Sequence, residues 1–424
     1  MDNAIDTAQR KRTLRLSAVL FAACWAVYCA SYLGRINYSA ALTAIVADGV
    51  FPKSQAGLIG TVYFFCYGTG QIISGIFGDR VSPYKMITAG LVFTSAANIL
   101  MPACSSSYIL MSVVWGFNGL AQSMLWTPIL FIISNVIPAE YRNRACLYIA
   151  ASYPTGSFLS YIISTLCIRF ASWRFAFYVP AVIILCVLAV WAVVAAKSSK
   201  VLGYKKEISA SPDSGSNAKP APVGKLIASS GAVLICAGIL IHGMLKDGVT
   251  SWVPTLITEE YSVPAFFSVL LSTLLPIVNL SGAWFSTKLF EKVFKNNEIA
   301  VTAFCFALSL IPLAGLVFVG KYHISICVIF FALFTSLIVA INHMFITLIP
   351  VRFAKFGRAS TMGGIFNATT YIGCAISTYG FGAVSENLGW TATVIFWLIL
   401  GVLGIIFCLA VMRKYKKFVG LKSE

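Results

Sequence analysis

Long apolar stretches recur along the whole chain, and they restrict it to folds that cross a membrane many times. Twelve stretches in the 424 residues are long enough to cross a bilayer as helices, given a hydrocarbon core about 30 Å thick. Only 11% of the residues are charged, which is typical of a polytopic membrane protein. We expect an all-α fold with membrane-spanning helices near residues 16–46, 55–77, 86–104, 107–137, 145–168, 174–196, 226–257, 264–286, 298–319, 323–349, 360–384 and 390–412.

Basic residues are distributed unevenly between the two sides of the predicted membrane. A net charge of +17 is also typical of nucleic-acid binders, but most of the 31 Lys and Arg residues fall in alternate loops and near both chain ends. This asymmetry is the positive-inside rule, and it places both termini in the cytoplasm. We therefore expect a monomer surrounded by lipid in the plasma membrane, a bacterial inner membrane being the predicted location, with no nucleic-acid partner.

The longest polar stretch between spans separates the first six from the last six. It is rich in Ser, Pro and Ala, the composition of a flexible linker. The predicted organisation is a cytoplasmic N-terminus (1–15), a six-helix bundle (16–196), a cytoplasmic linker (197–225), a second six-helix bundle (226–412) and a cytoplasmic tail (413–424).

The two predicted bundles repeat certain residues in equivalent places. The pairs, each at a nearly equal separation in the chain, are Arg35 with Lys246, Arg144 with Arg358, and Trp173 with Trp390. A parallel duplication of six-helix units explains this repeat. It predicts two pseudo-symmetric bundles, with a substrate site near the membrane midplane between them.

Arg35 and Lys246 are the two cations that fall inside predicted spans. A charged residue at a helix centre costs about 2.5–3.5 kcal/mol by insertion scales, so it usually faces protein or a water-filled cavity. A long side chain near a span end can instead reach the headgroups. Since both cations lie at one depth on pseudo-symmetric helices, we expect them to point into one shared cavity that binds an anion.

The loop after the second span resembles the GxxxDRxGRK loop of the major facilitator superfamily. Gly75, Asp79 and Arg80 match the pattern, whereas the second Gly is replaced. The resemblance implies a cytoplasmic hinge that changes conformation and does not bind substrate. The equivalent loop of the second half, 286–295, has a degenerate form.

Three further stretches resemble the organophosphate:phosphate antiporters of that superfamily. They lie around Arg35 and Tyr38, over residues 118–128, and from Lys246 to the Trp252–Pro254 stretch. The resemblance implies that Arg35 and Lys246 bind a phosphate from either side. The chain departs from the family at three positions. Lys246 replaces an arginine, Gln71 replaces a lysine, and Ser152, beside Tyr153, replaces a histidine. A carboxylate or sulfonate substrate therefore stays open.

We expect a transport site and no enzyme active site. Its charge comes from Arg35 and Lys246, and its hydrogen-bond donors are predicted to be Tyr38, Gln71, Gln122, Tyr153 and Tyr371. The cysteines lie in or beside apolar spans, without metal-ligand spacing, and we find neither a nucleophile with a paired base nor a cofactor loop. We therefore expect no metal and no cofactor.

Exchange of solutes is the predicted transport mode. Two unneutralised cations about 8 Å apart would repel by about 2 kcal/mol at an effective dielectric constant near 20, and a bound anion would remove this repulsion. The empty carrier should therefore reorient slowly and the loaded carrier quickly. This difference in rate favours exchange, and the predicted function is exchange of an organophosphate for inorganic phosphate.

Two other functions stay open. A proton-coupled symporter of sugar acids or other carboxylates would need a membrane-embedded titratable group, and Asp247, His242 and His343 are the candidates. Neighbours i and i+1 on a helix do not face each other, so Asp247 need not neutralise Lys246. Asp247 lies beside the Trp252–Pro254 region, which we expect to be unwound. A membrane sensor of a phosphorylated sugar would share the same fold.

Overall fold

The first half of the chain is a succession of long helices. The computed structural model describes residues 2–78, 81–201, 222–353, 356 and 358–420, which contain helices and no strands. The helices of the first half are α1 (Asp2–Ala47), α2 (Lys53–Gly78), α3 (Pro83–Ala103), α4 (Tyr108–Asn135), α5 (Ala139–Ile149), α6 (Ser152–Phe170) and α7 (Phe175–Val201).

The second half is helical too, but short π-helical segments interrupt several of its helices. Its elements are α8 (Val223–Ser230), α9 (Ala232–Gly243), η1 (Met244–Gly248), α10 (Val249–Tyr261), α11 (Ala265–Leu271), α12 (Leu274–Lys288), η2 (Leu289–Val293), α13 (Glu298–Phe318), η3 (Gly320–Tyr322), α14 (Ile324–Asn342), η4 (His343–Leu348), α15 (Ile349–Val351) and α16 (Ala359–Val419).

Ten helices in the described part of the chain are long and apolar enough to span a membrane. The longest, α16, consists of two helices joined at Gly389, whose φ of 81° belongs to the left-handed region that glycine tolerates. Helix α6 is 19 residues long but falls outside the ten. It is less apolar because a buried face carries serines, Ser152, Ser157, Ser160 and Ser164. The predicted all-α membrane fold is confirmed.

Some sequence predictions fall on residues outside the described ranges. Gly75 lies within α2, but Asp79 and Arg80 of the predicted hinge loop are not described. Helix α7 continues to Val201 and α8 begins at Val223, so both helices overlap the predicted linker, and residues 202–221 lie outside the description.

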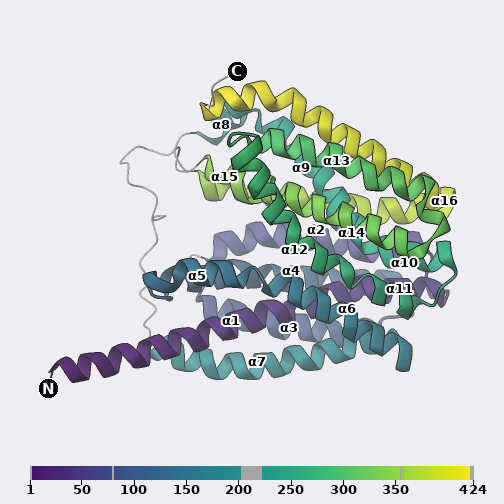
Figure 1. The fold of residues 1–424 in the computed structure, drawn as a ribbon. Coiled ribbons are helices and arrows are strands. Elements are labelled where there is room, and N and C mark those ends of the chain that lie inside the picture. The colour runs from purple at the N-terminus through teal and green to yellow at the C-terminus, as the bar shows by residue number, and fades with distance from the viewer. Residues whose placement is uncertain (1, 79–80, 202–221, 354–355, 357, 421–424) are drawn as a thin grey trace.

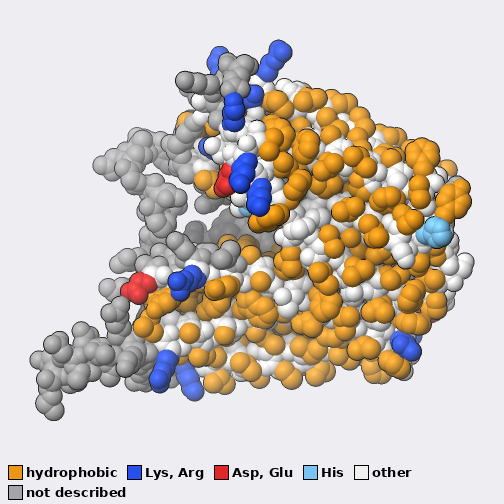
Figure 2. Space-filling view, in the orientation of Figure 1, with side chains coloured by type: hydrophobic (Ala, Val, Ile, Leu, Met, Phe, Trp, Pro, Cys, Tyr) orange, Lys and Arg blue, Asp and Glu red, His pale blue; other side chains and the backbone are white. Residues whose placement is uncertain are grey.

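The helices form two groups that follow the order of the chain. In Figure 1, α1, α3, α6 and α7 occupy the lower part of the view and α9, α13 and the C-terminal part of α16 the upper part. Within the first group α1 packs against α6 and α7, and within the second α13 packs against α14 and α16. Both chain ends lie at the same end of the molecule (Figure 1), and Figure 2 shows most of the visible basic side chains gathered there.

Contacts between the two groups have a symmetric pattern. Helix α2, the second predicted span, packs against α16, which begins with the eleventh, and α6, the fifth, packs against α12, the eighth. A shift by six spans converts one of these pairs into the other. The pattern agrees with the internal duplication inferred from the sequence.

Glycines allow α2 and α16 to approach closely. A Cβ atom at Gly57 would lie 2.6 Å from the Thr378 carbonyl oxygen, and one at Gly60 would lie 2.7 Å from Thr378 Cγ2. One at Gly68 would lie 3.0 Å from Tyr371 Cβ. We call Gly57, Gly60 and Gly68 the glycine seam, since larger side chains there would push the two groups apart.

Polar contacts join the two groups at the end opposite the termini. Lys53 Nζ lies 2.8 Å from Glu259 Oε2, and Trp390 donates its Nε1–H to the same oxygen at 2.7 Å. The Ser54 backbone N–H donates to Glu386 Oε2 at 2.7 Å. These residues form what we call the outer clasp, which holds α2 to α10 and α16.

Candidate functional site

Arg35 lies in the interior of α1, enclosed by aromatic rings. Only 8% of its side chain is exposed, and α1 carries Tyr32 and Arg35 nearly one turn apart, on a face that meets α2 and α16. The guanidinium carbon lies 4.7 Å from the ring centre of Tyr67 and between 5.5 and 5.9 Å from the ring centres of Tyr32, Tyr63, Phe64 and Tyr371. Such contacts stabilise a cation by about 0.5–2 kcal/mol each and hold its orientation.

Lys246 and Asp247 lie in the π-helical segment η1, between α9 and α10. A π-helical turn contains one extra residue, which locally changes the directions of its side chains, and such turns are frequent at functional sites. The sequence-based expectation of an unwound Trp252–Pro254 region was wrong, because these residues lie inside the regular helix α10. The irregular backbone occurs instead at the charged residues.

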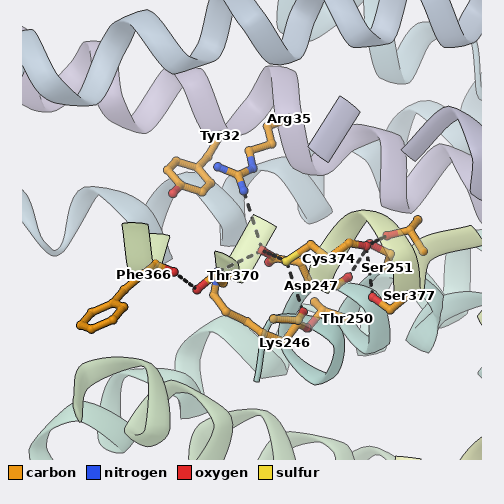
Figure 3. Close-up of polar contacts among 12 residues, drawn as sticks. Tyr32, Arg35, Lys246, Asp247, Thr250, Ser251, Phe366, Thr370, Cys374 and Ser377 are labelled. Carbon is orange, nitrogen blue, oxygen red and sulfur yellow. Dashed lines mark hydrogen bonds and ion pairs between the residues drawn. The ribbon is translucent and has the colours of Figure 1, made fainter. Parts of the chain in front are cut away.

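Asp247 bridges the two cations. Its Oδ2 atom lies 3.0 Å from Lys246 Nζ, 3.9 Å from Arg35 Nη2 and 3.3 Å from the Cys374 thiol. Figure 3 shows Arg35 reaching from one side toward Asp247, while Lys246 approaches from the same helix as Asp247. The sequence indicated only that Asp247 need not neutralise Lys246, and the structure shows that it does, since the long lysine side chain bends back to the carboxylate.

The charged groups border two small cavities, Arg35 and Asp247 both of them and Lys246 the first. The first, about 40 Å³, is lined by Tyr32, Arg35, Ile36, Tyr153, Lys246, Asp247, Thr250, Asn279, Thr335, Ile338 and Val339. The second, about 30 Å³, is bordered by Arg35, Asp247 and Thr250 together with residues of α2 and α4. Helices of both groups thus enclose a polar space around a fixed positive charge.

Three predicted donors lie beside the charged groups. Tyr153 lines the first cavity, and its ring packs edge-on against that of Tyr32, with centroids 4.9 Å apart. Tyr371 lies 5.7 Å from Arg35 and 5.9 Å from Lys246, measured to its ring centre. Tyr38 lines the second cavity, but its hydroxyl already donates to the Ala56 carbonyl oxygen at 2.6 Å.

The two predicted glutamines do not line either cavity. Gln122 on α4 donates its amide N–H to the Ser31 carbonyl oxygen of α1 at 2.9 Å, so it joins two helices. Gln71 lies on α2 one turn beyond Tyr67 and two turns beyond Tyr63, the residues at the depth of Arg35. As substrate contacts, both glutamines stay predictions.

The two histidines proposed for proton coupling have different surroundings. His242 is fully buried one turn before Lys246, and its ring lies 6.2 Å from that of Phe345. His343 begins η4 and its Nε2 lies 3.3 Å from Thr287 Oγ1. Neither lines the two cavities, so Asp247 is the proton-coupling candidate that borders them.

Sequence reasoning missed most of the uncharged site residues. Tyr32, Tyr63 and Tyr67 surround Arg35, and the Asn279 amide oxygen is buried at the cavity wall without a partner. Helical spacing was the available signal: Tyr32 precedes Arg35 by nearly one turn, and Tyr63 and Tyr67 lie one turn apart. Asn279 gave no comparable signal.

The chain is similar in sequence to a known family of membrane proteins and to individual members of it. The family model described as Major Facilitator Superfamily matches residues 24–378. A probable hexose phosphate transport protein of Chlamydia pneumoniae is 30% identical over 152 residues, which cover 36% of this chain and only 33% of that relative. The match thus spans about a third of that protein's length.

Two other comparisons extend over nearly the whole chain. A phosphoglycerate transporter protein of Salmonella typhimurium is 23% identical over 412 residues, 90% of this chain and 85% of the relative. Among solved structures, a bacterial homologue of the human lysosomal transporter Spinster, inward-facing and occupied, superposes with a TM-score of 0.78 at 12% identity, covering 95% of this chain and 98% of that one. At this identity the superposition shows the fold alone.

Proposed function

The chain belongs to the Major Facilitator Superfamily, and from this we propose that it exchanges a phosphorylated organic solute for inorganic phosphate. Membership makes it a multi-pass secondary transporter and not an enzyme. The relatives named above are hexose phosphate and phosphoglycerate transporters. The exchange and the choice of solute are our proposals.

One observation carries the proposal: two cations from different halves meet at one cavity. Arg35 comes from α1 and Lys246 from η1, and both line the same cavity. A phosphate has about −1.5 to −2 charge near neutral pH and several strong acceptor oxygens. Arg35, Lys246 and Tyr153 supply the charge and donors that such a group requires when it leaves water.

Alternating access is the transport cycle we propose. The two helix groups meet around the site, which fits substrate binding between halves that rock against each other. We propose twelve crossings: the ten apolar helices with α16 counted as two, together with α6. Both termini are then cytoplasmic, in agreement with the basic residues at that end, and the protein works as a monomer.

The charge of the site supports exchange. The sequence predicts two free cations, but Asp247 neutralises one of them. One positive charge still lacks a partner in the empty site, and an unpaired buried charge is costly. Closure without an anion is therefore disfavoured, although less than the sequence suggested.

Replacement of either cation tests the proposal. Purified wild-type protein should be stabilised against heat by inorganic phosphate and by glycerol 3-phosphate, because both bind the folded state. Arg35→Gln and Lys246→Gln should lose this stabilisation, whereas Arg174→Gln, which changes an exposed arginine outside the site, should retain it. Normal affinity in Arg35→Gln and Lys246→Gln would remove the two cations from the site.

Transport in proteoliposomes tests the exchange. Uptake of labelled phosphate should require phosphate or a phosphoester inside the vesicles. Rapid net uptake into vesicles without an internal anion would contradict exchange, and ligand-induced stabilisation without counterflow would favour a membrane sensor.

Proton-coupled symport of a carboxylate is the second candidate, and the position of Asp247 favours it. The carboxylate borders both cavities, as a proton-carrying group must. Stabilisation by sugar acids and not by phosphoesters, with uptake driven by an imposed pH gradient, would support this function.

A further inference from the structure

The candidate site contains a carboxylate as well as two cations, and this sets its formal charge. Asp247 Oδ2 contacts Lys246 at 3.0 Å and Arg35 at 3.9 Å. Among the described residues that line the two cavities, Asp247 is the only carboxylate. With these three groups ionised, the site has one positive charge in excess.

The other titratable groups around Asp247 do not change the formal charge of the site. Tyrosine and cysteine are neutral near pH 7 in their usual state. His242 is fully buried, where the charge of an imidazolium would be costly. Arg35 of α1, Lys246 of η1 and Cys374 of α16 contact Asp247 directly. The other titratable groups near enough to interact with its charge are Tyr63 of α2, Tyr153 and Tyr161 of α6, His242 of α9 and Tyr371 of α16.

A site with one excess positive charge is balanced by one negative charge on the ligand. A singly charged anion makes the occupied site neutral. A doubly charged anion leaves it negative, unless Asp247 takes up a proton from solution. Since an unbalanced charge in a water-poor cavity is costly, a neutral occupied site is the state expected to reorient.

We propose that this transporter carries its solute as a monoanion, with Asp247 as the residue that selects for a single negative charge. The inference rests on the proposed function, and it narrows the substrate class. A phosphomonoester is taken in its singly ionised form, which is equivalent in charge to the dianion with a proton on Asp247. Sulfonates and sugar acids, which have one charge throughout the neutral range, fit the same site.

The second ionisation of a phosphomonoester allows binding of the monoanion to be distinguished from binding of the dianion. Its pKa is near 6, so the monoanion fraction falls about tenfold for each pH unit well above that value. If the monoanion is bound, the apparent affinity for glycerol 3-phosphate should fall about tenfold from pH 7 to pH 8. The affinity for 3-hydroxypropanesulfonate should change little, since its charge is constant over this range.

Asp247→Asn reverses the preference because it raises the formal charge of the site to two. Its affinity for glycerol 3-phosphate should hold or rise between pH 6 and pH 8, where wild type weakens. Asp48→Asn, which changes an exposed aspartate at the end of α1, is the matched control and should follow wild type. Dissociation constants for both probes would be measured by calorimetry on the purified full chain at each pH.

The wild-type series decides the matter even if Asp247→Asn does not fold. A glycerol 3-phosphate affinity that stays flat or rises from pH 6 to pH 8 in wild type overturns the monoanion proposal but leaves organophosphate transport standing. Binding of the sulfonate without any binding of glycerol 3-phosphate supports the monoanion site and removes the organophosphate. Failure to bind either probe at every pH removes both.

Discussion

At the scale of single residues, the charged members of the site could be predicted and the aromatic ones could not. Arg35 and Lys246 are conspicuous because a charge inside an apolar span is costly and therefore rare. Tyr32, Tyr63 and Tyr67 are not conspicuous, because 14% of this chain is aromatic. In the sequence, a tyrosine that contacts a cation cannot be told from a tyrosine that packs against lipid or another helix. Only the packing of α1, α2 and α16 shows which tyrosines surround Arg35.

Tyr67 should hold Arg35 in place by its ring. Its ring centre lies 4.7 Å from the guanidinium carbon and 4.5 Å from the centroid of Tyr371. Tyr67→Leu removes a contact that stabilises a cation by about 0.5–2 kcal/mol, so we expect anion affinity to fall several-fold, measured by calorimetry. Tyr67→Phe keeps the ring and should bind nearly as wild type, whereas equal losses in both variants would assign the role to the hydroxyl.

Asp247 shows a different limit of sequence reasoning. The rule that adjacent residues on a helix point apart holds for a regular α-helix, and it failed here because η1 is π-helical and the lysine side chain is long. No residue pattern in Met244–Gly248 predicted the π-helical backbone. The sequence therefore predicted both cations but not the charge that the site presents.

At the scale of elements, the outer clasp joins helices from the two halves. Lys53 at the start of α2 contacts Glu259 of α10, and 34% of the glutamate side chain remains exposed. Partly exposed ion pairs stabilise by about 1 kcal/mol or less. A contact of this strength holds one end shut but still allows it to open during transport.

Glu259→Gln should loosen the outer clasp and expose the cavity on that side. Ser39 lines the second cavity, so Ser39→Cys provides a thiol whose labelling rate by a membrane-impermeant maleimide reports opening. We expect labelling to be several-fold faster in Glu259→Gln than in the parent, and unchanged in Glu260→Gln, a variant of the exposed neighbour. The chain without Ser39→Cys gives the background from its native cysteines.

Equal labelling in Glu259→Gln and Glu260→Gln would show that the ion pair does not restrain opening. Slower labelling of all variants upon addition of phosphate would connect the outer clasp to the occupied site.

At the scale of the whole molecule, the fold was predictable and its internal contacts were not. The apolar stretches predicted the all-α membrane fold, and the resemblance of the loop at Gly75 and of the stretches around Arg35 and Lys246 predicted the family. The two-half architecture stays a prediction. The structure pairs α2 with α16 and α6 with α12, and no pattern in the sequence specified these partners. Helix α6 is an example, because its sequence does not reveal whether its serines face another helix, as they do here, or lipid.

The division into two halves predicts that the connection between them tolerates change. Deletion within residues 207–219, which the sequence predicts to be a linker, should leave transport measurable, because shortening a linker changes the free-energy cost of its closure by only about 1 kcal/mol or less. Counterflow of labelled phosphate in proteoliposomes would measure it, with the full chain as the control. Complete loss of counterflow in a variant that still shows ligand-induced stabilisation would make the segment regulatory.

The glycine seam gives the molecule a lever. Two helix groups can rotate about a place where their backbones approach closely, and Gly68, which meets Tyr371 beside Arg35, gives such a place near the middle of α2. From Gly68 the helix extends 15 residues to Lys53 and ten to Gly78, about 22 Å and about 15 Å at about 1.5 Å per residue. Because the pivot lies between the two ends, a small rotation there widens one end of the passage while it narrows the other.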